Sequence, residues 1–321
     1  MKFGLTGAGG RRAAEIAACI CVLIFLAVSA GGRLSPYSAA EGGVAEYPEE
    51  ESEKGGVSIY EKDGGKYYSF QDVEENCYEA PLLEDVPLNT YDFSLLETDE
   101  ETGYKSYTDE ENGITARFGI DVSEFQGEEI DWQQVKEAGV EFVFVRLGYR
   151  AYGEGGELVL DAMYDQNVQG ALSAGLDVGV YFFSQATSAA EAVEEAEFVL
   201  KHIRPYEVTG PVIYDTEEIK WDTARTDENT DQDFTNYCKV FCETVEHAGY
   251  DTMIYSNLKW MSFTLDMEEL AGYDFWYSDY HEIPQNPYEY KVWQYSETGV
   301  VPGINANVDL NLWFEREPQG D

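Results

Sequence analysis

The 321-residue sequence predicts an α/β fold, an irregular TIM-like (β/α) barrel, and three observations support this prediction. Between Arg117 and Phe314, short apolar runs rich in β-branched and aromatic residues alternate with helical patterns, which is typical of βα units around a parallel sheet. Eight such runs fall within about 200 residues, and eight is the strand number of a closed barrel. Capping residues stand where several of the intervening helices would begin.

The first 30 residues have the composition of a targeting segment. A basic start precedes the uncharged, mostly apolar run Ile16–Ala30, and Val28-Ser29-Ala30 has the small residues of a cleavage site. The run is short for a membrane span, which needs about 20 apolar residues. Residues 1–30 are therefore predicted to be a signal peptide, and the alternative is a membrane tether through residues 13–30. Either way, the protein is expected to be secreted or held at the cell surface.

Residues 31–116 have the composition of an acidic, low-complexity linker. Residues 41–116 alone carry 22 Asp/Glu and four Lys, a net charge of -18. Such a stretch buries too little apolar surface to offset its conformational entropy, so we expect a largely disordered linker. The range Tyr67–Tyr91 is richer in aromatic residues, which leaves a small ordered piece as an alternative there.

The barrel itself is predicted to span residues 117–316. Its strands are expected where apolar runs are bounded by turn residues or charges. The predicted strands are Phe118–Asp121, Phe142–Leu147, Asp177–Phe183, Val212–Glu217, Thr252–Tyr255, Phe275–Ser278, Val292–Gln294 and Val308–Leu310.

Helices between these strands are marked by capping residues and apolar stripes. The capping pairs are Asp131 with Gln134, Ser188 with Glu191, and Thr230 with Asp233. The helix that begins after Thr230 is predicted to end before Gly249, since glycine is favoured just past a helix C-terminus. Cys238 and Cys242 fall on the apolar stripe of this helix, so we interpret them as buried residues and not as metal or redox ligands.

The net charge of -43 excludes several classes of function. With 20 Lys+Arg against 63 Asp+Glu, the chain lacks the clustered basic residues that nucleic-acid phosphates require. The same charge disfavours adsorption to an anionic membrane surface. Only three His are present, which leaves a histidine-centred hydrolase or a zinc enzyme few residues to use.

Asp215 and Glu217 are the first candidate catalytic residues. Side chains two apart on a strand point to the same face, with Cα atoms about 6.6 Å apart. The pair ends the predicted strand Val212–Glu217, and barrel enzymes keep their active sites at that end. Two carboxylates this close raise the pKa of one member, which provides an acid near neutral pH. Glycoside cleavage needs such an acid and a second carboxylate.

Asp121 and Asp309 strengthen this interpretation. Asp121 ends the first predicted strand and Asp309 lies in the last one. The first and last strands are neighbours in a closed barrel, so the two carboxyl groups are expected to meet at one rim.

The sequence from about Phe118 to Phe314 resembles the glycoside hydrolase family 25 lysozymes, the Chalaropsis-type muramidases. The resemblance rests on several blocks in one order, of which the closing block is the most specific. The blocks are Gly119–Gly127, Val145–Tyr149, Gly179–Ala186, Asp215–Glu217, Ile254–Asn257, Phe275–Tyr277, and the closing Val292–Ser296, Gly299–Ile304 and Asn307–Asn311.

The resemblance implies hydrolysis of the β-1,4 bond between N-acetylmuramic acid and N-acetylglucosamine in bacterial peptidoglycan, without a metal or organic cofactor. Carried over by position, Glu217 would be the general acid that later acts as base. Asp121, Asp215 and Asp309 match the family's other active-site acids. Products of the family are thought to retain configuration, with the substrate's acetamido group as nucleophile and Asp215 orienting it. Spacing alone leaves retention and inversion open.

Aromatic residues near the predicted strand ends supply the expected binding surface for peptidoglycan glycan strands. Flat rings can stack on sugars, although each could instead pack in the core. Tyr214 points away from Asp215 and is assigned to the core. The predicted substrate-binding residues are Asp309, Tyr181, Trp276, Tyr280, Trp293 and Gln294. We expect a monomer.

Two other functions remain open at this point. A catalytically silent peptidoglycan-binding barrel would keep the cleft without turnover, and the presence of all four acids argues against it. An acidic, cation-buffering surface protein would leave the barrel pattern unexplained, and the sequence lacks an Asp-rich calcium loop.

Overall fold

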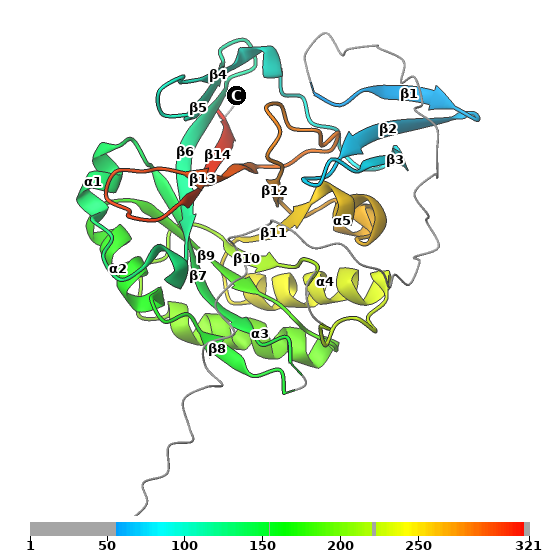
Figure 1. The fold of residues 1–321 in the computed structure, drawn as a ribbon. Coiled ribbons are helices and arrows are strands. Elements are labelled where there is room, and N and C mark those ends of the chain that lie inside the picture. Colours follow the sequence, from blue (N-terminus) through cyan, green and yellow to red (C-terminus); the bar gives the residue numbers. More distant parts are fainter. Residues whose placement is uncertain (1–55, 154, 220–222, 318–321) are drawn as a thin grey trace, which may run out of the picture. The chain divides into compact units, whose positions relative to one another are not determined.

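The computed structural model describes residues 56–153, 155–219 and 223–317 (Figure 1). The predicted signal peptide and residues 31–55 of the predicted linker lie outside these ranges. Within the described residues, no helix is long and apolar enough to cross a bilayer.

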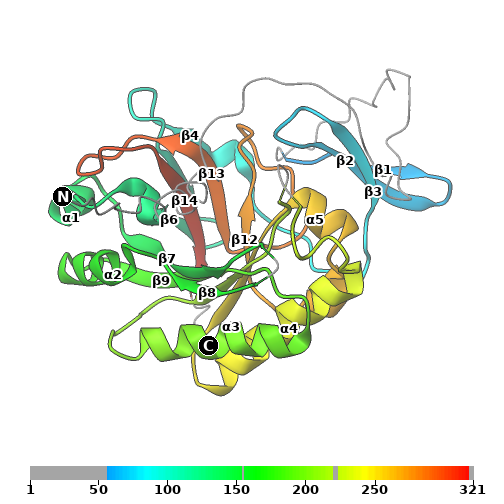
Figure 2. The same ribbon diagram turned by 60° about the horizontal axis from the view of Figure 1, so that its bottom comes forward.

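Eight strands close into the predicted barrel (Figures 1 and 2). The first of them, β6, pairs with both β7 and β14, which closes the sheet on itself. All eight predicted strands are present, most of them longer than predicted. They are β6 (Ile114–Val122), β7 (Phe142–Arg150), β9 (Asp177–Phe183), β10 (Val212–Asp215), β11 (Thr252–Asn257), β12 (Phe275–Ser278), β13 (Val292–Gly299) and β14 (Val308–Arg316).

The barrel is irregular because its last strand runs against its neighbours. Neighbouring strands from β6 to β13 pair in parallel, whereas β14 is antiparallel to both β13 and β6. Residues 300–307 connect β13 to β14, and a parallel crossover needs a dozen or more residues. The short connection therefore imposes a hairpin.

Helices cover one part of the barrel, and their starts agree with the predicted caps. They are α1 (Trp132–Glu137), α2 (Tyr164–Ser173), α3 (Ala189–Ile203), α4 (Asp231–His247), α5 (Leu258–Phe263) and α6 (Met267–Leu270). Asp131, Ser188 and Thr230 are N-caps that accept backbone N–H groups, and Gly249 follows α4 with φ of 91°. Cys238 and Cys242 are fully buried on α4, as predicted.

Residues 57–109, which we call the N-terminal segment, are folded. Three strands form a small antiparallel sheet, β1 (Ile59–Lys62), β2 (Gly65–Gln71) and β3 (Cys77–Pro81). A 3₁₀ turn (Phe93–Leu95) and β4 (Leu96–Thr98) follow, and β5 (Lys105–Asp109) pairs with β6. The prediction of a largely disordered linker is wrong for these residues, and the ordered alternative for the aromatic range holds.

The physical reason is the uncovered outer face of the barrel. In the part of the chain that the structure describes, no helix follows β12, β13 or β14. Aromatic side chains of the N-terminal segment take the place of helices there. The ring of Tyr91 stacks on Phe314 at 4.3 Å and lies 5.4 Å from Tyr290, while Tyr107 meets Phe314 edge-on at 5.3 Å. These rings bury the apolar face that the barrel would otherwise expose.

Candidate active site

Carboxyl groups gather at the barrel rim where the parallel strands have their carboxyl ends and the antiparallel β14 has its amino end. Asp121 on β6 pairs in register with Asp309 on β14, so the predicted meeting of the first and last strands is confirmed. Asp215 is the last residue of β10. The strand was predicted to reach Glu217, but it ends at Asp215, so Glu217 lies in the loop that follows. The charge of Glu217 still contributes to the raised pKa of Asp215.

Asp121 is held by two amide donors. Gln294 Nε2 and Asn311 Nδ2 each donate a 2.9 Å hydrogen bond to Asp121 Oδ2. Asp309 also shares a side-chain hydrogen bond with Asp121. A hydrogen bond between two carboxyl groups needs one proton, and the amide donors favour the ionised form of Asp121. Asp309 is therefore the member that carries the proton.

Burial and mutual repulsion shift these carboxyl groups toward the protonated form. Burial raises the pKa of Asp121, although its amide donors oppose the change. Burial and the charge of Asp121 raise the pKa of Asp309 well above its usual value. Burial and the negative charges of Glu217 and Asp121 likewise raise the pKa of Asp215 well above its usual value. The cluster thus holds protons at a pH where isolated carboxyl groups are ionised.

Asp215 offers an unused acceptor. Its side chain is buried, and within the described residues its Oδ1 has no hydrogen-bond partner. A buried polar atom without a partner costs free energy, so its persistence at a strand end is typical of an atom that meets a ligand.

Arg146 on β7 is a site residue that the sequence analysis did not single out. Its positive charge opposes the rise in the pKa of Asp215. Its Nε donates to Asp161 at 2.7 Å, its Nη2 to Glu124 at 3.0 Å, and its guanidinium lies 4.9 Å from the ring centre of Phe125. The feature that could have identified Arg146 is its charge within the otherwise apolar run 142–147.

Tyrosine hydroxyls form a second layer around Asp121. Tyr255 and Tyr280 each donate a 3.0 Å hydrogen bond to Gln294 Oε1, whose amide nitrogen points at Asp121. Tyr181, from β9, is partly exposed, and the charges of Asp121 and Asp215 act on its hydroxyl. Of these residues, Tyr181, Tyr280 and Gln294 were predicted, and Tyr255 was missed.

The two predicted tryptophans are buried, so neither offers a ring to a substrate. Trp276 points into the barrel but is 1% exposed, with its ring against Tyr181 and Tyr255. It packs inside the barrel beneath the site, and neither face of its ring is free to stack on a sugar. Trp293 precedes Gln294 on β13 and lies on the opposite, outer face of the sheet, where its Nε1 donates to the backbone oxygen of Asp279. Tyr214 is buried, as predicted.

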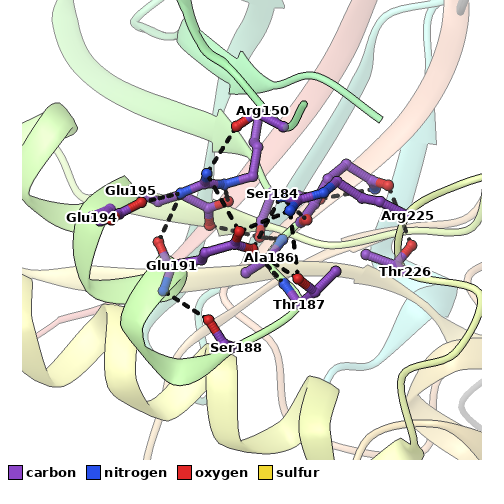
Figure 3. A network of polar contacts seen from close by, with 12 residues as sticks. Arg150, Ser184, Ala186, Thr187, Ser188, Glu191, Glu194, Glu195, Arg225 and Thr226 are labelled. Atoms are coloured by element: carbon purple, nitrogen blue, oxygen red, sulfur yellow. Dashed lines mark hydrogen bonds and ion pairs between the residues drawn. The ribbon is translucent and has the colours of Figure 1, made fainter. Parts of the chain in front are cut away.

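A polar network outside the barrel connects the ends of β7, β9 and β10 (Figure 3). Arg150 Nε and Ser184 Oγ each donate to the buried Glu195 carboxylate at 2.7 Å. Burial raises the pKa of Glu195 to about 7. Ser184 Oγ also lies 2.7 Å from the Tyr214 hydroxyl, and its backbone N–H donates to the backbone oxygen of Asp215. The network therefore supports the strand end that carries Asp215.

Arg225 extends this network to the loop that carries Glu217. Its guanidinium donates to both carboxylate oxygens of Glu191, at 2.7 and 3.0 Å, and to the backbone oxygen of Gln185 (Figure 3). Its backbone N–H donates to the backbone oxygen of Tyr152. Arg225 thus connects the loop after β10 to the loop after β9 and to α3 through its side chain, and to the loop after β7 through its backbone N–H. No sequence pattern pointed to this residue.

The site has no arrangement typical of a metal centre among the residues that the structure describes, where no group of three or more His, Cys, Asp or Glu could hold an ion. A closed α/β barrel with interacting carboxyl groups of raised pKa at the strand ends is the arrangement of a glycoside hydrolase.

A sequence model of the glycosyl hydrolases family 25 matches residues 120–304, more than half of the chain, and the protein belongs to this family. The autolytic lysozyme of Clostridium acetobutylicum is 27% identical over 198 residues, which cover 61% of this chain and 56% of that protein. Lysozyme M1 of Streptomyces globisporus is 26% identical over 202 residues, 60% of this chain and 66% of that protein. The match therefore spans little more than half of the Clostridium lysozyme.

Solved structures show the same fold. The modular autolysin LytC of Streptococcus pneumoniae superposes with a TM-score of 0.55 at 21% identity, covering 80% of this chain and 58% of LytC. A family 25 glycosyl hydrolase of Bacillus anthracis gives a TM-score of 0.51 at 19% identity, covering 68% of this chain and 94% of that chain.

Proposed function

We propose that this protein is a lysozyme, an N-acetylmuramidase that hydrolyses the β-1,4 bond between N-acetylmuramic acid and N-acetylglucosamine in bacterial peptidoglycan. The carboxyl cluster of Asp121, Asp215 and Asp309 beside Glu217, in a chain of family 25, is the observation that carries the proposal. Two relatives are named as lysozymes, and one LytC structure contains a synthetic peptidoglycan ligand. Both findings support peptidoglycan as the substrate class.

In the proposed mechanism, Glu217 protonates the glycosidic oxygen as that bond breaks. The acetamido oxygen of the substrate attacks the anomeric carbon from the other side and closes a ring. Glu217, now ionised, removes a proton from water, and the resulting oxygen nucleophile opens the ring with retention of configuration. Asp215 has a buried oxygen without a partner among the described residues, which suits it to accept the acetamido N–H and orient that group.

The remaining residues take supporting roles in this proposal. Asp121 carries negative charge near the developing oxocarbenium ion, and Asp309 holds the proton of the Asp121–Asp309 pair. Tyr181, Tyr280 and Gln294 line the substrate side of the site. The proposed setting is extracellular, as a secreted or surface-attached monomer acting on glycan strands.

Replacing Glu217 by Gln tests the mechanism. The amide keeps the shape but cannot supply a proton, so clearing of purified cell walls should fall by at least about 10²-fold. Folding, followed by circular dichroism, and binding to insoluble walls should stay close to wild type. Asp215→Asn should also reduce turnover more than binding.

Residual clearing above a few per cent in Glu217→Gln would remove that residue from the mechanism. Wild-type protein that binds walls without clearing them would instead indicate a silent binding barrel. Muropeptide products analysed by mass spectrometry identify the bond that is cut.

A further inference from the structure

Residues 279–291 connect β12 to β13 without a helix, and they carry Tyr280. We call them the β12–β13 loop. A loop of this length, without secondary structure of its own, needs outside contacts to hold one conformation. Many of its hydrogen bonds come from the N-terminal segment, which lies before the residues matched by the family.

The tip of the loop is held by two residues of the segment. Gln71 and Gln285 exchange two hydrogen bonds: the Gln71 N–H donates to Gln285 Oε1 at 2.9 Å, and Gln285 Nε2 donates to the Gln71 backbone oxygen at 3.0 Å. Lys105 Nζ donates to the backbone oxygen of Glu282 at 3.1 Å. The Lys105 side chain is nearly buried and also lies over the rings of Trp293 and Tyr295.

The second half of the loop pairs with the segment through its backbone. Asn89 N–H donates to the backbone oxygen of Pro287, and Glu289 N–H donates to the backbone oxygen of Pro87, each at 2.9 Å. The Tyr91 hydroxyl donates to the backbone oxygen of Tyr290 at 2.6 Å. Figures 1 and 2 show the segment beside β12 and the loop that follows it.

The loop reaches the carboxyl cluster through Tyr280. The Tyr280 hydroxyl donates to Gln294 Oε1, and Gln294 Nε2 donates to Asp121. An oxygen that accepts from two hydroxyls fixes which end of the amide faces Asp121. The flipped amide would place an oxygen against the carboxylate, which is unfavourable.

We propose that the N-terminal segment is a positioning element of the active site. By holding the β12–β13 loop, it sets the Tyr280 hydroxyl, and through Gln294 it sets the hydrogen bonding of Asp121. The inference rests on the proposed muramidase function for its kinetic consequence, whereas the ordering of the loop does not depend on that function.

Lys105→Met in the full chain is the first test. Methionine keeps the apolar stem but loses the bond to Glu282. Hydrogen exchange of residues 279–291 should accelerate at least about tenfold, and kcat/KM on soluble glycan fragments should fall by about tenfold. Lys62→Met is the matched control, because Lys62 contacts Glu79 and Tyr67 within the segment. It should leave both readouts unchanged.

A double variant separates positioning from loss of stability. If Lys105 acts through Tyr280, Lys105→Met combined with Tyr280→Phe should be no slower than Tyr280→Phe alone, within about twofold. Additive losses in kcat/KM, or exchange in the loop equal to wild type, would overturn the proposal. The wild type could lack muramidase activity while Lys105→Met still accelerates hydrogen exchange of residues 279–291. That result would support the positioning of the loop and reject the proposed function.

Discussion

Buried carboxyl groups at the rim of the barrel suit the proposed chemistry but lower the stability of the folded state. Asp309 and Asp215 are both held where burial and neighbouring charge favour protonation. A carboxyl group whose pKa is raised by folding destabilises the folded state at every pH above its unfolded pKa, near 3.9. The destabilisation grows as pH rises from that value through the folded pKa. The contribution of these two active-site groups to stability should therefore become more unfavourable over this range.

Asp309→Asn should relieve this cost. The amide can still donate to Asp121 but carries no charge, so the midpoint of thermal unfolding should rise at pH 7 by a few degrees relative to wild type. The two midpoints should converge as pH falls toward 4, because Asp309 then stays protonated in the folded state and is about half protonated in the unfolded state. Scans between pH 4 and pH 8 measure the effect, and a variant less stable than wild type at pH 7 would contradict the raised pKa.

At the scale of elements, the alternation of apolar runs with helical patterns and the capping residues predicted the barrel strands and several helix starts. Asp177–Phe183 and Phe275–Ser278 were placed to the residue, because apolar runs bounded by turns are read directly from the chain. The end of β10 was missed, since Asp-Thr-Glu continues the alternation after the ladder stops. In β2, Tyr68 and Phe70 alternate inward, but surrounding charges concealed this short pattern.

The site residues also divide into those that sequence patterns identify and those that only the folded chain brings to the site. The carboxyl groups could be predicted because strand ends meet at one rim. Trp293 could not be placed, because its exposure depends on the N-terminal segment that covers β13. Arg225 joins three loops, and such a contact appears only in the folded chain.

Arg225→Gln should slow catalysis by loosening the loop that carries Glu217. Loss of the two-point contact with Glu191 should lower kcat by about tenfold or more, with KM changed less than about threefold. Arg225→Lys should restore part of kcat, since one ionic contact can re-form. Glu194→Gln is the control, because that side chain is 60% exposed and contacts only Arg150 among these groups. Equal losses in Glu194→Gln and Arg225→Gln would indicate a general structural effect.

At the scale of the whole molecule, the fold is a barrel whose covering is shared between helices and an N-terminal segment. The helices pack on β7, β9, β10 and β11. The segment covers β14 and the β12–β13 loop with aromatic rings, and its Lys105 lies over two rings of β13. An acidic composition therefore did not exclude a structural role, because buried rings and hydrogen bonds join the segment to the barrel.

A chain that begins at Gly113 should be much less stable than one that begins at residue 56. Removal of Tyr91, Phe93 and Tyr107 uncovers the outer barrel face, and each buried aromatic side chain contributes about 1.5–3 kcal/mol. The unfolding midpoint should fall by more than about 10 °C, or the protein should aggregate. Calorimetry of both proteins measures this, and equal midpoints would show that the segment is dispensable.

The antiparallel closure also fixes where the chain enters and leaves the barrel. Ile114 and Arg316 are paired across β6 and β14, and the Glu317 N–H donates to the backbone oxygen of Gly113. Asp121 lies seven residues along β6, about 23 Å away along an extended strand. A bead, fluorophore or fusion partner attached after Glu317 would therefore be at the face opposite the carboxyl cluster. The protein could be immobilised through that end with its site still open to an insoluble polymer.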